Sequence, residues 1–218
     1  MKKLILLLIV PFVSFGQDGC SYNNTIDYSE ICNSLRSNFY SNASAESALE
    51  MIVEASGLAK NFALVQCDDI NNCYATEHNG VRLIIYDGDF MQQVANNNYG
   101  KISILAHEIG HHINGHVVGK RTNSLSLSRK RQQELEADSW SGRVMYLLGY
   151  SLEEAQEAIR KAIKSNIDDP LSTHPSRDKR LSAIKKGWEN AKKTVEQLTS
   201  SINTVSNNDD DEYVPQSM

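Results

Sequence analysis

Long apolar runs and an excess of positive charge are both missing from this sequence of 218 residues. No apolar run reaches the roughly 18 residues that a membrane helix needs, so no transmembrane helix is expected in the mature chain. The 22 basic and 27 acidic residues give a net charge of -5, which excludes the basic surface typical of nucleic-acid-binding domains. Aromatic residues are scarce at 7%, but the apolar content of 40% is sufficient for a sizeable core.

The first residues have the order of a secretory signal peptide. Residues 1–3 are basic at two positions, residues 4–13 are apolar, and small residues stand at positions 14 and 16. This order predicts cleavage before Gln17 and an exported protein, periplasmic or extracellular. A buried first helix is the alternative interpretation. A lipid anchor on Cys20 is less favoured, because the three residues before it match a lipoprotein signal poorly.

Cysteine is also scarce, and its four copies all lie in the first third of the chain. An even number in an exported protein predicts two disulfides. Of the three possible connectivities, Cys20–Cys32 with Cys67–Cys73 is favoured, because short loops close most readily. A four-cysteine metal site is disfavoured, since the spacings lack the CxxC pairs that such sites usually have.

The hydrophobic pattern predicts an α+β protein, with a small sheet followed by several helices. Strands are expected at 61–66 and 81–86, and helices at 28–39, 45–55, 101–115, 128–148, 151–165 and 176–201. The expected organisation is a signal peptide at 1–16, a cysteine-containing segment at 17–43, one main domain at 44–204 and a disordered acidic tail at 205–218.

The most informative stretch is His107-Glu108-Ile109-Gly110-His111, which follows an apolar run over residues 102–106. Residues four apart on a helix differ by about 40° in direction, so both imidazoles can reach one metal ion. Glu108 points about 100° away from His107, where it can contact a water on that metal. This is the HExxH arrangement of two zinc ligands and a general base. A metal or a hydrogen-bond network is needed to make their burial tolerable.

A catalytic zinc site needs a third protein ligand. The metzincin spacing fails, because position 117 is Val and the nearby glycine is Gly115. On a continuous helix, His112 and His116 would both point away from the ligand face, which favours supporting or surface positions for them.

Better candidates for the third ligand are Glu134 and Asp138, which lie four apart on another predicted helix and therefore share a face. One carboxylate can bind the metal while the other orients a ligand or braces the two helices. Glu136, between them, is expected on a solvated face.

Three ordered motifs resemble those of the HtpX-like and CAAX-prenyl-protease-like zinc metallopeptidases: His107-Glu108-Ile109-Gly110-His111, Glu134-Leu135-Glu136-Ala137-Asp138, and Thr173-His174-Pro175 with Arg180-Leu181. The resemblance spans roughly residues 61–184. It implies a zincin-like fold with the sheet packed on the HExxH helix, and it implies a glutamate as third zinc ligand, at Glu134. Asn72-Cys73-Tyr74-Ala75 is similar to a family segment that precedes the cleft-lining strand.

The sequence also departs from the family pattern. Cys73 stands where alanine is usual, Leu181 stands where isoleucine is usual, and the membrane helices of many members are missing. The chain therefore resembles the soluble, exported branch, which weakens any transfer of membrane or prenylated substrates.

Together the motifs predict a zinc metalloendopeptidase that hydrolyses peptide bonds of exported or envelope proteins, with one Zn²⁺ held by His107, His111 and Glu134. Glu108 is expected to take the proton of the attacking water and pass it to the leaving amine. Residues 81–86 are expected to pair with an extended polypeptide substrate.

Two further residues have expected roles near the metal. His174 is the candidate for stabilising the oxyanion or for capping the metal when substrate is absent, and otherwise is a loop histidine fixed by Pro175. Arg180 is expected to pair with Asp138 or another site carboxylate, the alternative being an exposed helix arginine.

Two alternatives to peptidase function stay open: a non-catalytic, chaperone-like zinc module in envelope protein assembly, and a zinc hydrolase acting on a non-peptide bond. The intact Glu108 favours catalysis over the first, and an extended cleft strand favours peptides over the second. The sequence carries no signal for an oligomeric state.

Overall fold

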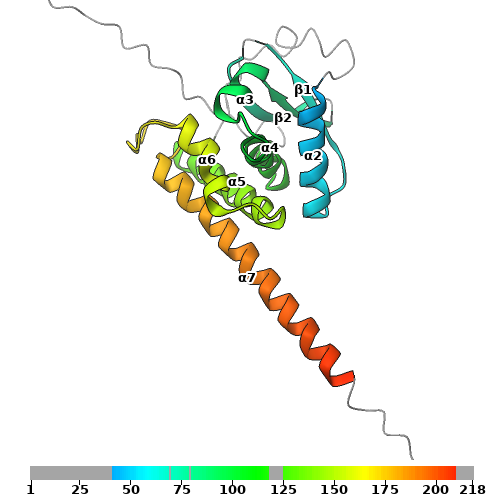
Figure 1. The fold of residues 1–218 in the computed structure, drawn as a ribbon. Coiled ribbons are helices and arrows are strands. Elements are labelled where there is room, and N and C mark those ends of the chain that lie inside the picture. Colours follow the sequence, from blue (N-terminus) through cyan, green and yellow to red (C-terminus); the bar gives the residue numbers. More distant parts are fainter. Residues whose placement is uncertain (1–40, 69, 79, 118–124, 210–218) are drawn as a thin grey trace, which may run out of the picture.

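The computed structural model describes residues 41–68, 70–78, 80–117 and 125–209. Within these residues the fold is α+β, with six helices and one small sheet (Figure 1). The elements follow in the order α2 (Ala43–Ser56), β1 (Phe62–Gln66), β2 (Cys73–His78), β3 (Val81–Tyr86), α3 (Gly88–Val94), α4 (Asn98–Ile113), α5 (Leu127–Leu147), α6 (Leu152–Ala162) and α7 (Arg177–Asp209).

The sheet has the strand order β1-β3-β2, with β3 parallel to β1 and antiparallel to β2. Alternate residues of β3 face opposite sides, as the pleat of a strand requires. Ile84 and Tyr86 join the main core with α2 and α4, whereas Leu83 and Ile85 pack in a smaller cluster on the other face. The central strand is therefore buried on both faces, which explains its run of aliphatic residues.

Helix α4 is the element around which the others pack. It begins at the cap residue Asn97, whose side chain accepts a hydrogen bond from the Gly100 backbone N–H. It contacts the sheet and α2 on one side and α5 and α6 on the other (Figure 1). Apolar residues such as Ile102, Leu105 and Ile109 are fully buried. Because α4 is enclosed from both sides, its histidines and glutamate are buried as well.

Helices α5 and α7 cross at unusually close range because a glycine lies on each side of the contact. A Cβ atom added to Gly142 would overlap the Ile184 carbonyl oxygen, and one added to Gly187 would overlap the Ser139 carbonyl oxygen. Beyond this crossing, α7 projects away from the rest of the fold (Figure 1).

The predicted α+β class is confirmed, and both predicted strands form within one residue of their expected limits. The strand β2 and the short helix α3 were not predicted. The last helix extends to Asp209 instead of ending near Ser201. The predicted helix at 28–39 lies outside the described residues. No helix in the described part of the chain has both the length and the apolar character to cross a membrane.

The predicted Cys67–Cys73 disulfide is wrong. Cys67 is disulfide-bonded, but Cys73 carries a free, buried thiol. Cys73 opens β2, directly opposite Tyr86 of β3, so its side chain is committed to the main core. Cys67 packs in the smaller cluster on the opposite face of the sheet. Short sequence separation was therefore a poor guide, because the sheet stands between the two side chains. Cys20 and Cys32 lie outside the described residues.

The close crossing of α5 and α7 predicts a large cost for a single methyl group. We expect Gly142→Ala to lower the free energy of unfolding by about 2 kcal/mol, because the new methyl must push two helix backbones apart. This cost outweighs the gain of about 1 kcal/mol in helix propensity. Urea denaturation measures it. Arg143→Ala, at the exposed neighbouring position, should change the same quantity by less than about 0.5 kcal/mol. Equal effects of the two substitutions would contradict the packing argument.

The free thiol at Cys73 predicts a specific labelling pattern. Burial raises the pKa of the Cys73 thiol well above its usual value, and the charge of Glu108 adds to this effect. The thiol should therefore stay protonated and resist iodoacetamide in the native protein. In denaturant without reductant, peptide mass mapping should find Cys73 labelled and Cys67 unlabelled. Labelling of Cys67 before reduction would contradict this assignment.

Candidate metal centre

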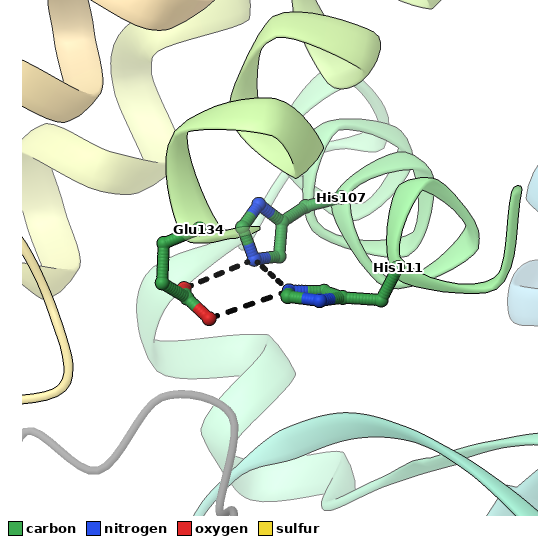
Figure 2. Close-up of side chains that lie close together, drawn as sticks. All are labelled: His107, His111 and Glu134. Carbon is green, nitrogen blue, oxygen red and sulfur yellow. Dashed lines mark hydrogen bonds and ion pairs between the residues drawn. The ribbon is translucent and has the colours of Figure 1, made fainter. Parts of the chain in front are cut away.

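His107, His111 and Glu134 form a buried cluster that could hold a metal ion, with one ligand atom of each within 4.8 Å of the others. Figure 2 shows the two imidazoles extending from one helix and the Glu134 carboxylate facing them from another. The Nε2 atoms of His107 and His111 are 3.2 Å apart. Glu134 Oε2 lies 3.5 Å from His107 Nε2, and Glu134 Oε1 lies 3.4 Å from His111 Nε2.

The chemistry of this cluster fits a cation. Glu134 is 0% exposed, yet neither of its carboxylate oxygens has a hydrogen-bond partner. A buried carboxylate without hydrogen bonds carries a large desolvation penalty. Two imidazole nitrogens and one carboxylate oxygen are a donor set that zinc prefers, and a catalytic zinc site uses three protein ligands. A cation between these atoms would supply the missing partner for Glu134.

An ion pair lies directly behind His107. His107 Nδ1 is 2.9 Å from Asp138 Oδ1. Arg180 donates two hydrogen bonds of 2.8 Å to the same carboxylate, one from Nε and one from an Nη atom. A carboxylate that accepts the N–H of a ligand histidine fixes its orientation and leaves the other ring nitrogen free to bind a metal. The structure thus brings Asp138 and Arg180 together with His107, and an Arg180 Nη atom also lies 3.7 Å from Glu134 Oε2.

The charges of this buried group shape its pKa values. Burial lowers the pKa of His107, but the Asp138 carboxylate outweighs it and raises that pKa to about 10. Burial lowers the pKa of His111 to about 3, so this ring is neutral. Burial opposes ionisation of Glu134, yet the neighbouring histidines hold its pKa below the usual range. An ionised Glu134 and a neutral His111 are in the state that a cation requires, whereas a cation would have to displace the Nε2 proton of His107.

His174 lies over this cluster on the loop before α7. Its Nε2 atom is buried without a hydrogen-bond partner, 3.6 Å from Glu134 Oε2. Its Nδ1 atom lies 3.0 Å from the Thr173 hydroxyl.

Sequence reasoning missed the residue that holds this loop, Arg131 of α5. Its guanidinium donates to the backbone carbonyls of Asp169 at 2.7 Å and of His174 at 3.0 Å. Arg131 is one of three consecutive basic residues, and such a run is typical of an exposed helix face, so the sequence gave no signal for this role.

Glu108, the predicted general base, is buried on α4 next to His107 in sequence. Its charge is one cause of the raised pKa of the Cys73 thiol, after burial. Glu108 therefore lies on the side of α4 that faces the start of β2.

The two histidines that the sequence left in supporting or surface positions are both buried. His112 is tied to the sheet, with Nε2 2.9 Å from the Leu83 carbonyl oxygen. Burial lowers its pKa to about 4, so it is a neutral structural residue. His116 turns back toward His111 instead of continuing along the helix, with the two Nδ1 atoms 3.0 Å apart. The helical projection failed for His116 because α4 ends at Ile113.

The expected pairing of substrate with residues 81–86 is wrong. That segment is β3, the central strand, and it is paired with β1 on one side and β2 on the other. A strand with two partners has no backbone groups left for a third. In the part of the sheet that the structure describes, β1 and β2 are the outer strands, and an added strand would have to pair with one of them.

Comparison with known families gives one match, to the model described as Peptidase family M48, over residues 120–187. The matched segment carries Glu134, Asp138, His174 and Arg180, and it begins after His107 and His111. Comparison with curated proteins and with solved structures gives no match.

This family consists of zinc-dependent metallopeptidases with a zincin-like fold, in agreement with the α+β architecture and the His107, His111 and Glu134 cluster. The match agrees with the resemblance found in the sequence: residues 120–187 of this chain are similar to peptidase family M48, which includes the HtpX-like and CAAX-prenyl-protease-like enzymes.

Proposed function

We propose that this protein is a zinc-dependent endopeptidase that cleaves polypeptides among exported or envelope proteins. The observation that carries the proposal is the buried convergence of His107, His111 and Glu134, with both Glu134 oxygens lacking hydrogen-bond partners. The M48 match supports the same reaction class. The export of the protein and of its substrates rests on the signal-peptide pattern of residues 1–16.

His107, His111 and Glu134 would hold one Zn²⁺ per chain. Zinc at this position lowers the pKa of water toward about 7 and polarises a carbonyl group. Asp138 and Arg180 keep the His107 ring turned so that Nε2 faces the cluster. Glu108 is the general base: it accepts the proton of the attacking water and delivers it to the nitrogen of the leaving amine. Its burial at 3% exposure keeps competing solvent away.

His174 is suited to bind the developing oxyanion. Its Nδ1 atom faces the Thr173 hydroxyl, while Nε2 points toward Glu134 without a partner of its own. Arg131 of α5 donates hydrogen bonds to the backbone of the loop that carries His174, so the His174 ring is held in place before substrate arrives. A fixed donor of this kind costs no reorganisation during the reaction, which is the basis of electrostatic catalysis.

The central experiment separates metal binding from catalysis. Glu134→Ala should lose zinc, because it removes a ligand, whereas Glu108→Gln should keep zinc and lose hydrolysis of unfolded casein. Metal content by atomic emission and peptide release with and without chelator are the two measurements. Glu153→Ala, at an exposed position on α6, is the control and should keep both zinc and hydrolysis.

Zinc retained by the Glu134 variant would overturn the ligand assignment. Casein cleavage unaffected by chelator would overturn the zinc peptidase. Zinc binding without casein cleavage in the wild type would favour the chaperone-like alternative.

The role of His174 gives a prediction with a defined sign. If His174 stabilises the oxyanion, His174→Ala should lower kcat by about 10²–10³ while zinc content stays unchanged. If the ring only caps the metal, the same substitution should raise the activity. We expect the decrease. Steady-state kinetics on a fluorogenic peptide, paired with metal analysis of the same samples, distinguishes the two. Unchanged kcat with unchanged zinc would leave His174 only a structural role.

A further inference from the structure

The imidazole of His116 contacts His111 at the ring nitrogen that does not face the candidate metal cluster. His116 Nδ1 lies 3.0 Å from His111 Nδ1, and His116 Nε2 lies 2.9 Å from Glu136 Oε2. His116 is 2% exposed, so this contact is enclosed by protein. The row His111, His116, Glu136 therefore leads from the candidate metal cluster to the surface of α5.

The end of α4 explains why His116 lies there. The His116 N–H donates to the His111 carbonyl at 2.9 Å, and the Gly115 N–H donates to the His112 carbonyl at 3.2 Å. Gly115 has φ +70°, a left-handed conformation that glycine adopts at low cost. These two bonds and this glycine make a Schellman motif, which places the residue after the glycine against the residue five positions earlier. In most helices that contact is apolar; here it joins two imidazoles.

The hydrogen-bond roles in this row are mutually determined. His111 Nε2 faces Glu134 and His107, so a metal there needs the lone pair of that nitrogen. The proton of a neutral His111 must then be on Nδ1, which donates to His116 Nδ1. The proton of a neutral His116 must in turn be on Nε2, which donates to the Glu136 carboxylate. A neutral imidazole can play both roles at once, because it has one donor and one acceptor.

Glu136 is fixed at the end of the row by its neighbours on α5. Its other oxygen accepts hydrogen bonds of 3.2 Å from an Arg129 Nη atom and from the Gln132 amide. Its side chain is 32% exposed, in contrast to the fully buried Asp138 behind His107. The two candidate ligand histidines thus have different supports: His107 contacts a carboxylate directly, and His111 reaches one through a second histidine.

We propose that His116 and Glu136 are positioning residues that hold His111 in the tautomer and orientation needed to bind zinc. The inference rests on the proposed function, because it assumes that His107, His111 and Glu134 bind the metal. It assigns a purpose to two residues outside the three motifs, and it makes the Schellman turn at Gly115 part of the metal centre. Outer partners of ligand histidines typically change metal affinity by about 10- to 100-fold when removed.

Zinc affinity, measured by competition with a chromophoric chelator, tests the proposal. His116→Leu keeps the apolar volume but accepts no hydrogen bond, so it should weaken zinc binding by about 10- to 100-fold. His116→Gln should restore most of the affinity, because its amide oxygen accepts from His111 while its amide nitrogen donates to Glu136. Glu136→Gln, at a partly exposed position that tolerates change, should weaken binding in the same direction. Combining it with His116→Leu should cause no further loss, since both act through one row.

A matched control separates this role from general destabilisation. His112→Gln alters a buried histidine next to the same ligand, but one bonded to the Leu83 carbonyl. It should lower the stability of the metal-free protein in urea without weakening zinc affinity. If wild type binds zinc and His116→Leu binds it equally well, the proposal is overturned while the proposed function stands. Equal losses in the Leu and Gln variants of His116 would also overturn it. Failure of the wild type to bind zinc would remove the proposed function itself.

Discussion

The burial of the Glu134 carboxylate between two histidines is the constraint on which the rest of this structure depends. A carboxylate at 0% exposure is expensive unless positive charge or hydrogen donors surround it. The side chains that face it come from three elements: His107 and His111 from α4, His174 from the loop before α7, and Arg180 from the first turn of α7.

Helix α5 supplies the acidic groups for this arrangement. Glu134, Glu136 and Asp138 lie near its middle. Glu134 faces His107 and His111, Asp138 faces His107 and Arg180, and Glu136 faces His116. Arg131 on the same helix fastens the loop that carries His174. The helix therefore acts as the common support of the site. This helps to explain why it is polar on average although its middle is buried: its buried residues include Gln133, Glu134, Asp138 and Ser141.

Much of the site could be predicted because its motifs are local. The spacing of His107 and His111 fixes their common face, and the spacing of Glu134 and Asp138 does the same on another helix.

The sequence could not provide the path of the chain between elements. The supporting position expected for His116 agrees with its contact to His111, but the turn that places it there was not predicted, because α4 ends at Ile113, two residues before the predicted end. The strand β2 was missed because Ala75 and Glu77 are residue types depleted in strands, although the segment pairs with β3. The Cys67–Cys73 error arose because sequence separation does not show that the two side chains lie on opposite faces of the sheet.

The projecting helix α7 has two different surroundings along its length. Up to Ala191 its residues pack into the body, with Gly187 in backbone contact with α5 and Arg180 bonded at the metal cluster. From Lys192 to Asn203 every side chain is exposed. Substitutions in the first part are constrained by sterics and by charge at the candidate metal centre. Within the described structure, side chains in the second part contact only solvent. The packing of the fold therefore places no constraint on their sequence. Related chains should therefore diverge sharply in sequence at one point within a single unbroken helix.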